Sequence, residues 1–583
     1  MLLASLTLAS AKAAPGATVP WITYEAEDMQ TTGLILGPNG EPNTVAWEAS
    51  GGRCVKLAAT GEYVEFPARE TANAVVVRYS LPDAADGGGV DSTLSLYVNG
   101  VLVKQLPLTS RNAWLYGKYP FSNVPAKPAR NLFDEVRAPG LSIHAGDRVR
   151  LQYNADGNAP WAVIDLVDLE NTGPPLARPP GPWLSITEPP CNAAGNGVQD
   201  DTAALQDGIN EAVRQGKNVW VPAGTYLLTA DITNLHGVSI QGAGMWHTTF
   251  VGDPNLYINP NRRVRFTGCG SNVHLADFAI IGRLDYRNDS EANDGLGGTF
   301  GTGSSIARVW VEHTKTGFWV VNTSGLVIED CRVRDTVADG INLCVGMQNT
   351  LVTNCTTRGT GDDCFAMWPA NYQSQVYAPG GNVLTHCTGR LPFLANGGAL
   401  YGGTDNRIED CLFQDIPYGC GVLISGTFPV GANTFGGRTV VQRCRLVRCG
   451  GYDHTYGWRA ALQFTMEINP ITNVCIAHLD VVDSLSDGLS IIGPKLLAGA
   501  TVSELNIPNF GLGTRGRHGL WASKGTAGSL DISNSTVVEQ RNDSASFTFH
   551  FASPGHSRSI GPTKSIGAST NAAELPVTKN LAQ

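Results

Sequence analysis

Apolar and polar residues alternate in several short segments of the first 170 residues. Side chains on one face of a β-strand recur at every second position, so this pattern is typical of strands with one buried face. Asn99-Gly100, at the end of one such segment, is a hairpin turn signal. We therefore predict an antiparallel β-sandwich over residues 21–170, with strands that include residues 61–66, 74–79, 94–98 and 148–153.

The pattern changes after a proline-rich stretch. Residues 171–183 contain five prolines and predict a stiff linker. An amphipathic helix is expected to begin at Asp200 and to end near Gly216, and residues 218–226 predict a strand and a turn. The segments that follow are short and lack helical periodicity, which favours β-structure for the rest of the chain.

A repeat organises this second part. Each of five cysteines follows a short apolar segment and precedes another, with spacings of 24, 32, 24 and 33 residues: Cys331, Cys355, Cys387, Cys411 and Cys444. Coils of about 24 residues, with loops inserted in some, are typical of a parallel β-helix, in which successive coils stack ~4.8 Å apart. We therefore predict an all-β chain with a right-handed parallel β-helix over residues 184–560.

The five repeated cysteines are expected to stack in one inward-facing column. Free cysteine is among the most buried residue types, which favours packed thiols over disulfides in this column. Neighbouring members could still reach disulfide geometry, so the pairing of the chain's 13 cysteines stays open at this point.

Aligning the coils by their cysteines brings aspartates together. Asp339 lies eight residues after Cys331, and Asp363 lies eight residues after Cys355, so the two aspartates occupy the same position of successive coils. Asp362 directly precedes Asp363. Like charges at this distance raise at least one pKa, and glycoside hydrolysis needs a protonated acid beside an ionised base. We therefore predict that these three aspartates are catalytic.

Two further expectations follow from the same alignment. The glycines within residues 395–398 of the next coil are expected to leave open space beside the carboxylates. Single aspartates at other corners, such as Asp335 and Asp415, are expected only to cap turns.

Aromatic residues follow the aspartates on the same side of the coils. Flat rings on an exposed sheet face suit stacking against sugar rings. The residues predicted to contact a glycan in this way are Trp368, Tyr372, Tyr401, Tyr452, His454 and Trp458.

Composition narrows the class of partner. Charged residues make up only 16% of the chain, the formal net charge is −10, and lysine and arginine do not cluster, which argues against nucleic-acid binding. No apolar run is long enough to span a membrane. Residues 1–13 end in a small-x-small pattern and predict a cleaved signal peptide, hence a secreted protein. We expect this protein to be a monomer, and residues 561–583 are expected to form a tail.

Two motifs at the predicted site resemble a known enzyme family. Asp339-Gly340-Ile341-Asn342 and Gly361-Asp362-Asp363-Cys364-Phe365-Ala366 resemble the catalytic region of glycoside hydrolase family 87, the α-1,3-glucanases and mycodextranases. The resemblance implies a β-helix of the pectate-lyase-like type that hydrolyses α-1,3-glucan or nigeran with inversion. Because Asp339 and Asp363 stack on successive coils, we expect them to hold the attacking water together, and the offset of Asp362 makes it the candidate general acid. The resemblance to polygalacturonase-like enzymes implies the same division, and an exchange of roles between Asp362 and Asp363 stays open. A retaining mechanism, with Asp339 or Asp363 as nucleophile, stays open.

Other β-helix enzymes, and a binding protein of the same fold, are the alternative functions. The aspartate pair is also similar to that of dextranases and polygalacturonases. The downstream segments here are Asn396-Gly397 and Arg407-Ile408-Glu409 instead of the His-Gly and Arg-Ile-Lys of polygalacturonases, which argues against a uronic-acid substrate. A non-catalytic β-helix adhesin that only binds glycan is the alternative of a different class.

The N-terminal segment resembles carbohydrate-binding modules of family 6 or 35, which are jelly-roll, galactose-binding-like sandwiches. Tyr24-Glu25-Ala26-Glu27 and Ile164-Asp165-Leu166-Val167-Asp168 carry the resemblance. In such modules a Glu-x-Glu pair and a late-strand aspartate hold a structural Ca²⁺. The resemblance therefore implies calcium ligands at Glu25, Glu27 and Asp165, with no cofactor for catalysis.

Overall fold

The alternating segments of the N-terminal part form two antiparallel sheets. The computed structural model describes residues 14–154, 159–428, 434–513 and 518–552. One sheet consists of β1 (Trp21–Glu25), β3 (Leu34–Leu36), β4 (Cys54–Leu57), β6 (Ala72–Ser80), β11 (Asp134–Ile143) and β13 (Ala162–Glu170). The other consists of β2 (Gln30–Thr31), β5 (Tyr63–Pro67), β7 (Asp91–Val98), β8 (Val101–Thr109) and β12 (Arg148–Gln152).

A shared apolar core joins the two sheets of the sandwich. Val75 and Val77 of β6 and Leu94 and Leu96 of β7 are fully buried in one cluster. Their two-residue spacing is the strand period that the alternating sequence pattern indicates. The prediction of an antiparallel sandwich is confirmed.

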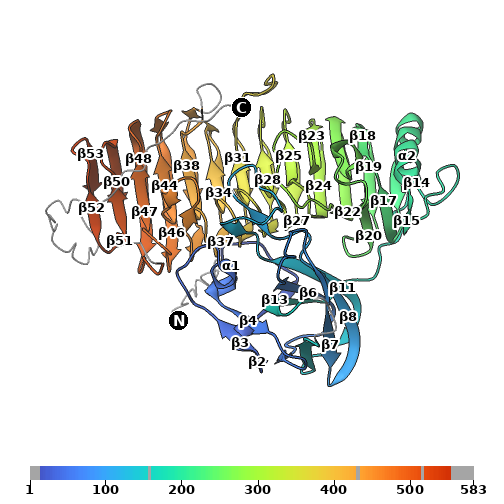
Figure 1. Cartoon of the computed structure of the whole chain (residues 1–583). Coiled ribbons are helices and arrows are strands. Elements are labelled where there is room, and N and C mark those ends of the chain that lie inside the picture. Colours follow the sequence, from blue (N-terminus) through green and yellow to red (C-terminus); the bar gives the residue numbers. More distant parts are fainter. Residues whose placement is uncertain (1–13, 155–158, 429–433, 514–517, 553–583) are drawn as a thin grey trace, which may run out of the picture.

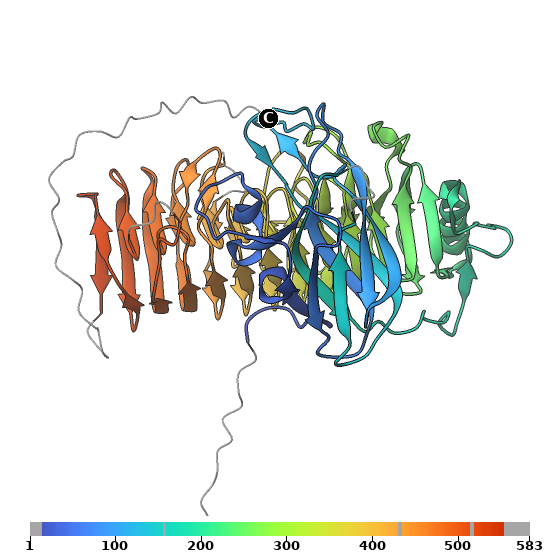
Figure 2. The same cartoon turned by 60° about the horizontal axis from the view of Figure 1, so that its bottom comes forward.

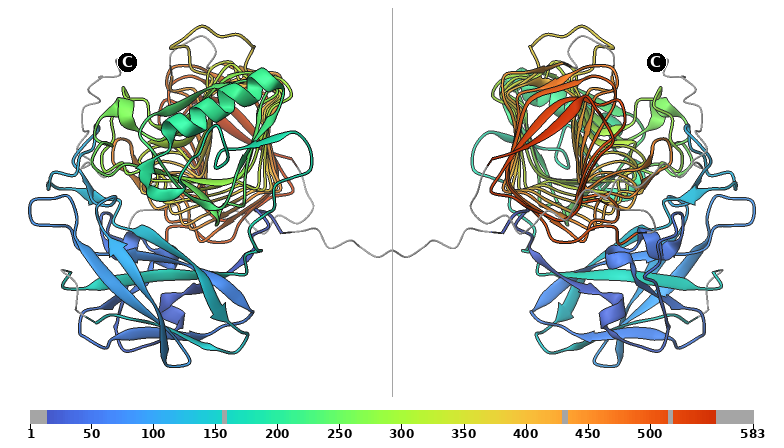
Figure 3. Two further views of the ribbon diagram at one scale, coloured as in Figure 1. Left: turned by 90° about the vertical axis from the view of Figure 1, so that its right-hand side faces the viewer. Right: turned by 90° about the vertical axis from the view of Figure 1, so that its left-hand side faces the viewer.

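The second part of the chain begins with a helix that covers one end of the molecule. After β14 (Trp183–Ser185), α2 (Thr202–Gln215) lies across the end of the first coil (Figures 1 and 3). Leu205, Ile209 and Ala212 of α2 are fully buried, and Gly216 ends the helix in a left-handed conformation with φ 63°. The helix and the strands after it, β16 (Asn218–Val221) and β17 (Gly224–Leu228), lie where the sequence predicts them.

From there on the chain winds into a parallel β-helix (Figure 1). One coil contains β26 (Val327–Glu329), β27 (Arg332–Arg334) and β28 (Ile341–Leu343). The next coil repeats these strands as β29 (Leu351–Thr353), β30 (Thr356–Arg358) and β31 (Phe365–Met367), each paired in parallel with its counterpart. The predicted fold is therefore confirmed.

One sheet of this β-helix carries the predicted site. In the described residues it contains 12 strands, which follow one another along the axis. They are β18 (Asp231–Leu235), β21 (Arg265–Gly270), β23 (Asp294–Phe300), β25 (Thr316–Val320), β28, β31, β34 (Gly398–Leu400), β38 (Val422–Ser425), β44 (Leu462–Thr465), β47 (Leu489–Ile492), β49 (Leu520–Ala522) and β52 (Gln540–Asn542). The last strand of the other, 24-stranded sheet in the described part is β53 (Phe547–Phe551).

The repeated cysteines stack inside the β-helix. The five members of the column, Cys331 to Cys444, are no more than 1% exposed, and strand register places each above the next. The backbone N–H of Cys355 points at the Sγ of Cys387, 3.4 Å away. All 13 cysteines lie in the described residues and are free thiols, so packing and not disulfide bonding explains the repeat.

Asp335 and Asp415 do not cap turns with their side chains, as the sequence suggested they would. Both occupy corners with positive φ. Neither carboxylate oxygen of Asp335 has a hydrogen-bond partner. The carboxylate of Asp415 instead accepts from the Arg448 Nε, at 2.5 Å, and from the backbone N–H of Gly51 in the sandwich, at 3.2 Å. That prediction was wrong because both side chains turn toward the neighbouring domain.

Residues 171–182, predicted as a linker, contain neither helix nor strand. The backbone N–H of Leu176 donates to the carbonyl of Ala243, 2.9 Å away, so this segment runs against the first coils. The predicted signal peptide, tail and final residues of the β-helix segment, 1–13 and 553–583, lie outside the described residues. No helix in the described part is long and apolar enough to cross a membrane.

The sandwich lies against the side of the middle coils (Figures 1 and 2). Buried ion pairs join the two domains there. Arg332 of β27 forms a two-pronged pair with Glu170 of β13, at 2.7 and 2.8 Å. Arg358 of β30 pairs with Glu135 of β11 and with Asp168 of β13, the latter at 2.9 Å. Removing one partner of a buried ion pair leaves an uncompensated buried charge and lowers stability by about 3–5 kcal/mol. These contacts therefore fix one orientation of the two domains.

A second contact lies further along the β-helix, next to α1 (Val45–Glu48). The indole N–H of Trp47 donates to the carbonyl of Pro417, 3.2 Å away, and the hydroxyl of Tyr418 donates to the Glu48 carboxylate, 2.9 Å away. Burial raises the pKa of Glu48 to about 7. Polar, buried contacts at these two places therefore join the two domains.

Candidate active site

The three predicted catalytic aspartates converge on one edge of the 12-stranded sheet. Asp339 lies in the turn before β28, and Asp362 and Asp363 lie in the bend before β31. One carboxylate oxygen from each lies within 4.8 Å of the others. The pairing of Ile341 with Phe365 puts Asp339 and Asp363 at the same position of successive coils, as predicted. Because Asp362 and Asp363 stand in a bend and not in a strand, both can face the same site.

Hydrogen-bond donors hold the two buried carboxylates. Asp363 accepts from the backbone N–H of Asn396 at 3.1 Å, from its side-chain amide at 2.7 Å, and from the Tyr401 hydroxyl at 2.8 Å. Asp339 accepts from the side-chain amide of Asn342, 3.1 Å away. Asp339 and Asp363 are 7% and 2% exposed. Both oxygens of Asp363 therefore have fixed donors, whereas Asp339 has fewer.

Asp362 is the accessible member of the group. Its side chain is 26% exposed and forms an ion pair with Arg287, 2.6 Å from the guanidinium to the Oδ2. Arg287 also contacts Asp289 at 2.9 Å and donates to the carbonyl of Gly361 at 2.9 Å. The guanidinium therefore fixes both the Asp362 side chain and the bend that carries it.

Burial and the nearby negative charges raise the pKa values of Asp339 and Asp363. Burial raises the pKa of Asp339 well above its usual range, and Asp362 and Asp363 raise it further. Burial, followed by the charge of Asp362, raises the pKa of Asp363 to about 7, although Asn396 and Tyr401 act in the opposite direction. A group of carboxylates with such pKa values retains a proton near neutrality, which acid–base catalysis requires.

The expectation of open space beside the carboxylates was wrong. Asn396 occupies the position that follows Asp339 and Asp363 in the next coil, and its amide fills the space next to Asp363. An added Cβ on Gly397 would lie 2.7 Å from the Phe413 ring, so this glycine is needed for interior packing.

One group of predicted aromatic residues lies beyond β31. The Trp368 ring lies 5.7 Å from Trp319 and 6.2 Å from Tyr372, and the Trp319 indole N–H donates to the Tyr372 hydroxyl at 2.9 Å. Tyr372 is 54% exposed. The Tyr401 hydroxyl donates to the Asp363 carboxylate, a contact that the sequence did not predict.

The other predicted aromatic residues share one loop. Tyr452 lies 5.7 Å from both His454 and Trp458, measured between ring centroids, and Trp458 lies 6.0 Å from Trp47 of the sandwich. Burial, and then the charge of Arg130, lower the pKa of His454 to about 3, which keeps its imidazole neutral. This loop is the part of the site that adjoins the sandwich.

The sandwich also reaches the catalytic residues. The backbone N–H of Arg287 donates to the carbonyl of Phe121, 3.1 Å away, and the Tyr119 ring lies 5.6 Å from the Arg287 guanidinium. The side-chain amide of Asn123 donates to Asp285 at 2.9 Å. The N-terminal domain therefore supports the arginine that holds Asp362.

Sequence reasoning missed three groups that contact the aspartates. Asn396 could have been found, because it is the next member of the column that contains Asp339 and Asp363. Asn342 follows Asp339 by three residues and offered no separate signal. Arg287 lies in a loop outside the repeat, so coil alignment could not reach it.

The predicted calcium ligands lie near one another in the sandwich. Oε2 of Glu25 and Oε2 of Glu27 are buried and lack hydrogen-bond partners, which suits a bound cation. Asp165 forms a buried ion pair with Arg78 and accepts from the Ser50 N–H at 2.9 Å. In the described residues, the groups of three potential ligands that converge within 4.8 Å do not include this set. The two glutamates fit calcium better than Asp165 does.

Two family models match most of the chain. The α-1,3-glucanase catalytic domain D1 matches residues 18–172, and the α-1,3-glucanase catalytic domain D2 matches residues 198–483. A comparison with curated proteins gives no match.

Solved structures resemble the whole molecule. The crystal structure of the Agl-KA catalytic domain has 26% identity and a TM-score of 0.83, covering 94% of this chain and 100% of its own. The catalytic unit of a thermostable GH87 α-1,3-glucanase from Streptomyces thermodiastaticus strain HF3-3 has 28% identity and a TM-score of 0.77, covering 92% and 96%. The catalytic domain of a GH87 α-1,3-glucanase in complex with nigerose has 27% identity and a TM-score of 0.78, covering 92% and 99%.

Fold, site and relatives together define a glycoside hydrolase built on a parallel β-helix. The chain belongs to the α-1,3-glucanases of glycoside hydrolase family 87, and it hydrolyses α-1,3-glucan. The dextranase, polygalacturonase and adhesin alternatives are thereby set aside.

Replacing Tyr401 by Phe tests the electrostatics of the site. The Tyr401 hydroxyl lowers the pKa of Asp363, so its removal should raise that pKa and move the acidic limb of the kcat/KM profile to higher pH. A hydrogen bond to a charged group contributes about 1.5–3 kcal/mol, which predicts a loss of roughly 10- to 100-fold in kcat/KM. The measurement is the pH dependence of hydrolysis of soluble α-1,3-gluco-oligosaccharides.

Tyr372→Phe is the matched control, since that hydroxyl contacts Trp319 and no catalytic carboxylate. It should leave the acidic limb in place. An unshifted limb in the Tyr401→Phe variant would show that Asp363 does not control activity through its ionisation.

Proposed function

We propose that Asp339, Asp362 and Asp363 cleave the α-1,3-glucosidic bond in one step, with inversion at the anomeric carbon. The observation that carries this proposal is the convergence of the three carboxylates within 4.8 Å, with one partly accessible and two buried. Inverting hydrolysis uses one carboxylic acid to protonate the leaving oxygen and one carboxylate to deprotonate water. No further cofactor is needed for these two proton transfers.

Complexes of related enzymes support this assignment. Structures of a GH87 α-1,3-glucanase contain nigerose or tetrasaccharides, and four of them carry single aspartate-to-alanine substitutions at three positions. The substituted aspartates of that enzyme are separated by 23 and 24 residues. Asp339 is separated from Asp362 and Asp363 by the same intervals.

Asp362 is our candidate for the general acid. It is the exposed member of the three, so it can reach the glycosidic oxygen of a bound polymer. Its proton would pass to that oxygen as the bond to the anomeric carbon breaks. The three carboxylates together retain a proton near neutrality, because burial raises the pKa of Asp339 and of Asp363. Arg287 acts as a positioning residue that fixes one oxygen of Asp362.

Asp363 and Asp339 are our candidates for holding the attacking water. They lie at equivalent positions of successive coils, so their oxygens can bind one water from the same side. The three donated hydrogen bonds keep Asp363 oriented as an acceptor. One of the two carboxylates takes the proton of the water as its oxygen attacks the anomeric carbon.

The aromatic residues would bind glucosyl units on both sides of this centre. Trp368 and Tyr372 form one surface beyond β31, and Tyr452, His454 and Trp458 form the other next to the sandwich. Stacking of a sugar ring on an aromatic face leaves its hydroxyls free for hydrogen bonds. This arrangement supports α-1,3-glucan as the polymer bound across the site.

We further propose that the sandwich binds a structural Ca²⁺ through Glu25 and Glu27, with Asp165 behind them. The unpartnered, buried oxygens of the two glutamates support this site. Burial raises the pKa of each glutamate to about 7, and a cation would stabilise their ionised forms. Ca²⁺ accepts carboxylate and carbonyl oxygens in variable number, which suits such an irregular set.

Export is part of the same proposal. A polysaccharide substrate is met outside the cell, and residues 1–13 have the composition of a signal peptide. Ten of the 13 thiols are buried, so an oxidising environment would find few of them accessible. We expect the exported protein to act as a monomer.

The stereochemical proposal is tested by the anomer formed first. Hydrolysis of an α-1,3-gluco-oligosaccharide followed by ¹H NMR should show β-anomer before mutarotation. Initial formation of the α-anomer would replace the inverting mechanism with a retaining one, in which Asp339 or Asp363 is the nucleophile.

The acid role of Asp362 is tested with a substrate that needs no protonation. Asp362→Asn should lose roughly 10²–10⁴-fold in kcat/KM on gluco-oligosaccharides. On α-nigerosyl fluoride, whose fluoride leaves without an acid, the loss should be about tenfold or less. Asp363→Asn is the matched control and should lose activity on both substrates. If the fluoride instead rescues Asp339→Asn and not Asp362→Asn, the acid role belongs to Asp339.

The calcium proposal is tested by thermal unfolding. A ligand bound only by the folded state adds about 2.7 kcal/mol at 100 times its Kd, so chelation should lower the Tm of calcium-loaded protein. Glu27→Gln should abolish this response, while Asp28→Asn, at the exposed neighbouring residue, should keep it. A Tm of the wild-type protein that changes with neither calcium nor chelator would contradict the calcium site.

A further inference from the structure

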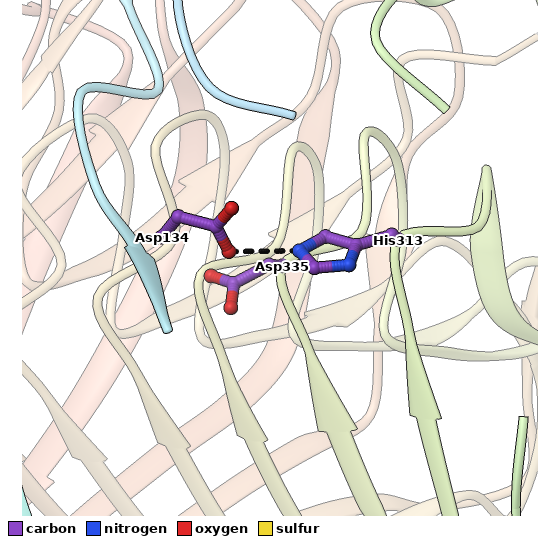
Figure 4. Close-up of side chains that lie close together, drawn as sticks. All are labelled: Asp134, His313 and Asp335. Carbon is purple, nitrogen blue, oxygen red and sulfur yellow. Dashed lines mark hydrogen bonds and ion pairs between the residues drawn. The ribbon is translucent and has the colours of Figure 1, made fainter. Parts of the chain in front are cut away.

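A second cluster of potential metal ligands lies between the two domains. Asp134 is the first residue of β11 in the sandwich. His313 follows β24 (Ser305–Glu312), and Asp335 follows β27. One ligand atom from each lies within 4.8 Å of the others, and the three side chains point toward one another (Figure 4). We propose that they bind a divalent transition-metal ion, with Zn²⁺ as the expected occupant, which joins the sandwich to two coils of the β-helix.

The β-helix supplies two ligands through its register. Glu312 pairs with Arg334, so the residues that follow them, His313 and Asp335, occupy the same corner of successive coils. The next residue in this corner column is Gly359, with φ 71°. An added Cβ there would lie 2.2 Å from Asp335 Oδ1, so the glycine leaves the room that this carboxylate occupies. The corner is thus shaped to hold Asp335 next to His313.

Three of the four carboxylate oxygens in the cluster lack hydrogen-bond donors; the fourth, Asp134 Oδ1, accepts from the Glu135 backbone N–H at 2.7 Å. Both oxygens of Asp335 and Oδ2 of Asp134 are buried without a hydrogen-bond partner. The residues are 6% and 2% exposed, and His313 is 8% exposed. The one polar contact within the cluster is between His313 Nε2 and Asp134 Oδ1, at 2.7 Å. Leaving buried carboxylate oxygens without a partner is costly, whereas coordination of a cation satisfies them.

The arginines near this cluster form ion pairs with carboxylates outside it. Arg78 pairs with Asp165 inside the sandwich. Arg358 pairs with Glu135 and Asp168 across the interface. None of these pairs brings a hydrogen bond to Asp335, whose two carboxylate oxygens have no partner in the described part of the chain.

Charge and ligand type favour a transition metal over calcium. Two ionised carboxylates and a neutral imidazole carry two negative charges, which a divalent ion balances. Imidazole nitrogen is a preferred ligand of Zn²⁺, whereas Ca²⁺ prefers oxygen ligands alone. Zinc bonds to nitrogen and carboxylate oxygen are about 2.0–2.2 Å long, so small side-chain movements would bring these three atoms into one coordination sphere.

Such an ion would lie at the start of the catalytic turn. Asp335 begins the segment 335–340, which carries Asp339. Coordination would tie the start of this segment to the sandwich and to the preceding coil. The ion would thus be structural and separate from the catalytic carboxylates and from the glutamates assigned to calcium.

The test is zinc binding by the full-length protein after treatment with a chelator and gel filtration. Titration calorimetry and elemental analysis should give one Zn²⁺ per chain, and zinc should raise the Tm. Co²⁺ in its place should produce visible d–d absorption typical of nitrogen and oxygen ligands. Asp335→Asn and His313→Gln, which preserve side-chain size, should each weaken binding by more than the 10- to 100-fold typical of outer-shell substitutions.

Three variants serve as controls. Asp363→Asn removes a carboxylate from the catalytic cluster, Glu27→Gln alters the glutamate pair, and His386→Gln removes an exposed histidine at a corner. All three should still bind one Zn²⁺. Loss of zinc in Asp363→Asn alone would place the ion in the active site and overturn the proposal.

Wild-type protein that binds less than about one-tenth of an equivalent of zinc would equally overturn it, without reliance on any variant. Far-ultraviolet circular dichroism of each variant verifies that it is folded. If Asp335→Asn does not fold, the zinc affinities of His313→Gln and Asp134→Asn are compared with that of the wild type instead. Unchanged zinc affinity in both variants would contradict the site.

Discussion

The parallel stacking of successive coils is the constraint on which this molecule depends. Backbone hydrogen bonds hold equivalent residues ~4.8 Å apart, so any residue type that recurs in the repeat forms a column. Thiols tolerate this arrangement and fill the interior from Cys331 to Cys444. Carboxylates do not, because stacking brings like charges together in a buried place. The repulsion between Asp339 and Asp363 is therefore a direct result of the fold.

The surroundings of the aspartates reduce this repulsion without removing it. Asn342, Asn396 and Tyr401 donate to the two buried carboxylates, and Arg287 balances the charge of the exposed Asp362. Arg287 in turn is held by Phe121 of the sandwich. The N-terminal domain thus belongs to the catalytic unit, in agreement with its match to a catalytic-domain model, and buried arginine–carboxylate pairs keep it in place.

The sequence was most informative where the repeat is regular. Coil alignment was sufficient to predict Asp339 beside Asp363. Parallel strands pair in register, so two residues at the same distance from successive column cysteines lie next to each other. The same alignment would have identified Asn396. Arg287 was beyond reach, since its loop has no counterpart in the other coils. Tyr401 was expected to stack on sugar. Strand register aligns it with Trp368, and the contact of its hydroxyl with Asp363 depends on the direction of its side chain, which the repeat does not specify.

The remaining differences come from contacts between domains. Asp335 resembles a turn-capping residue in sequence, yet its side chain points at His313 and at Asp134 of the sandwich. Asp165 fits a calcium motif, yet Arg78 binds it. A pattern in one segment cannot show which residue of a distant segment will pair with it, so ion pairs across the interface had to be seen in the structure.

Coil register builds the catalytic centre of this enzyme. A crystal structure of the Asp362→Asn variant with an α-1,3-linked tetrasaccharide tests it most directly. We predict that residue 362 lies within hydrogen-bond distance of a glycosidic oxygen, and that a water bound by both Asp339 and Asp363 lies on the opposite side of the anomeric carbon. An oligosaccharide whose glycosidic oxygen contacts Asp339 or Asp363 instead, with no water between those two residues, would contradict the account.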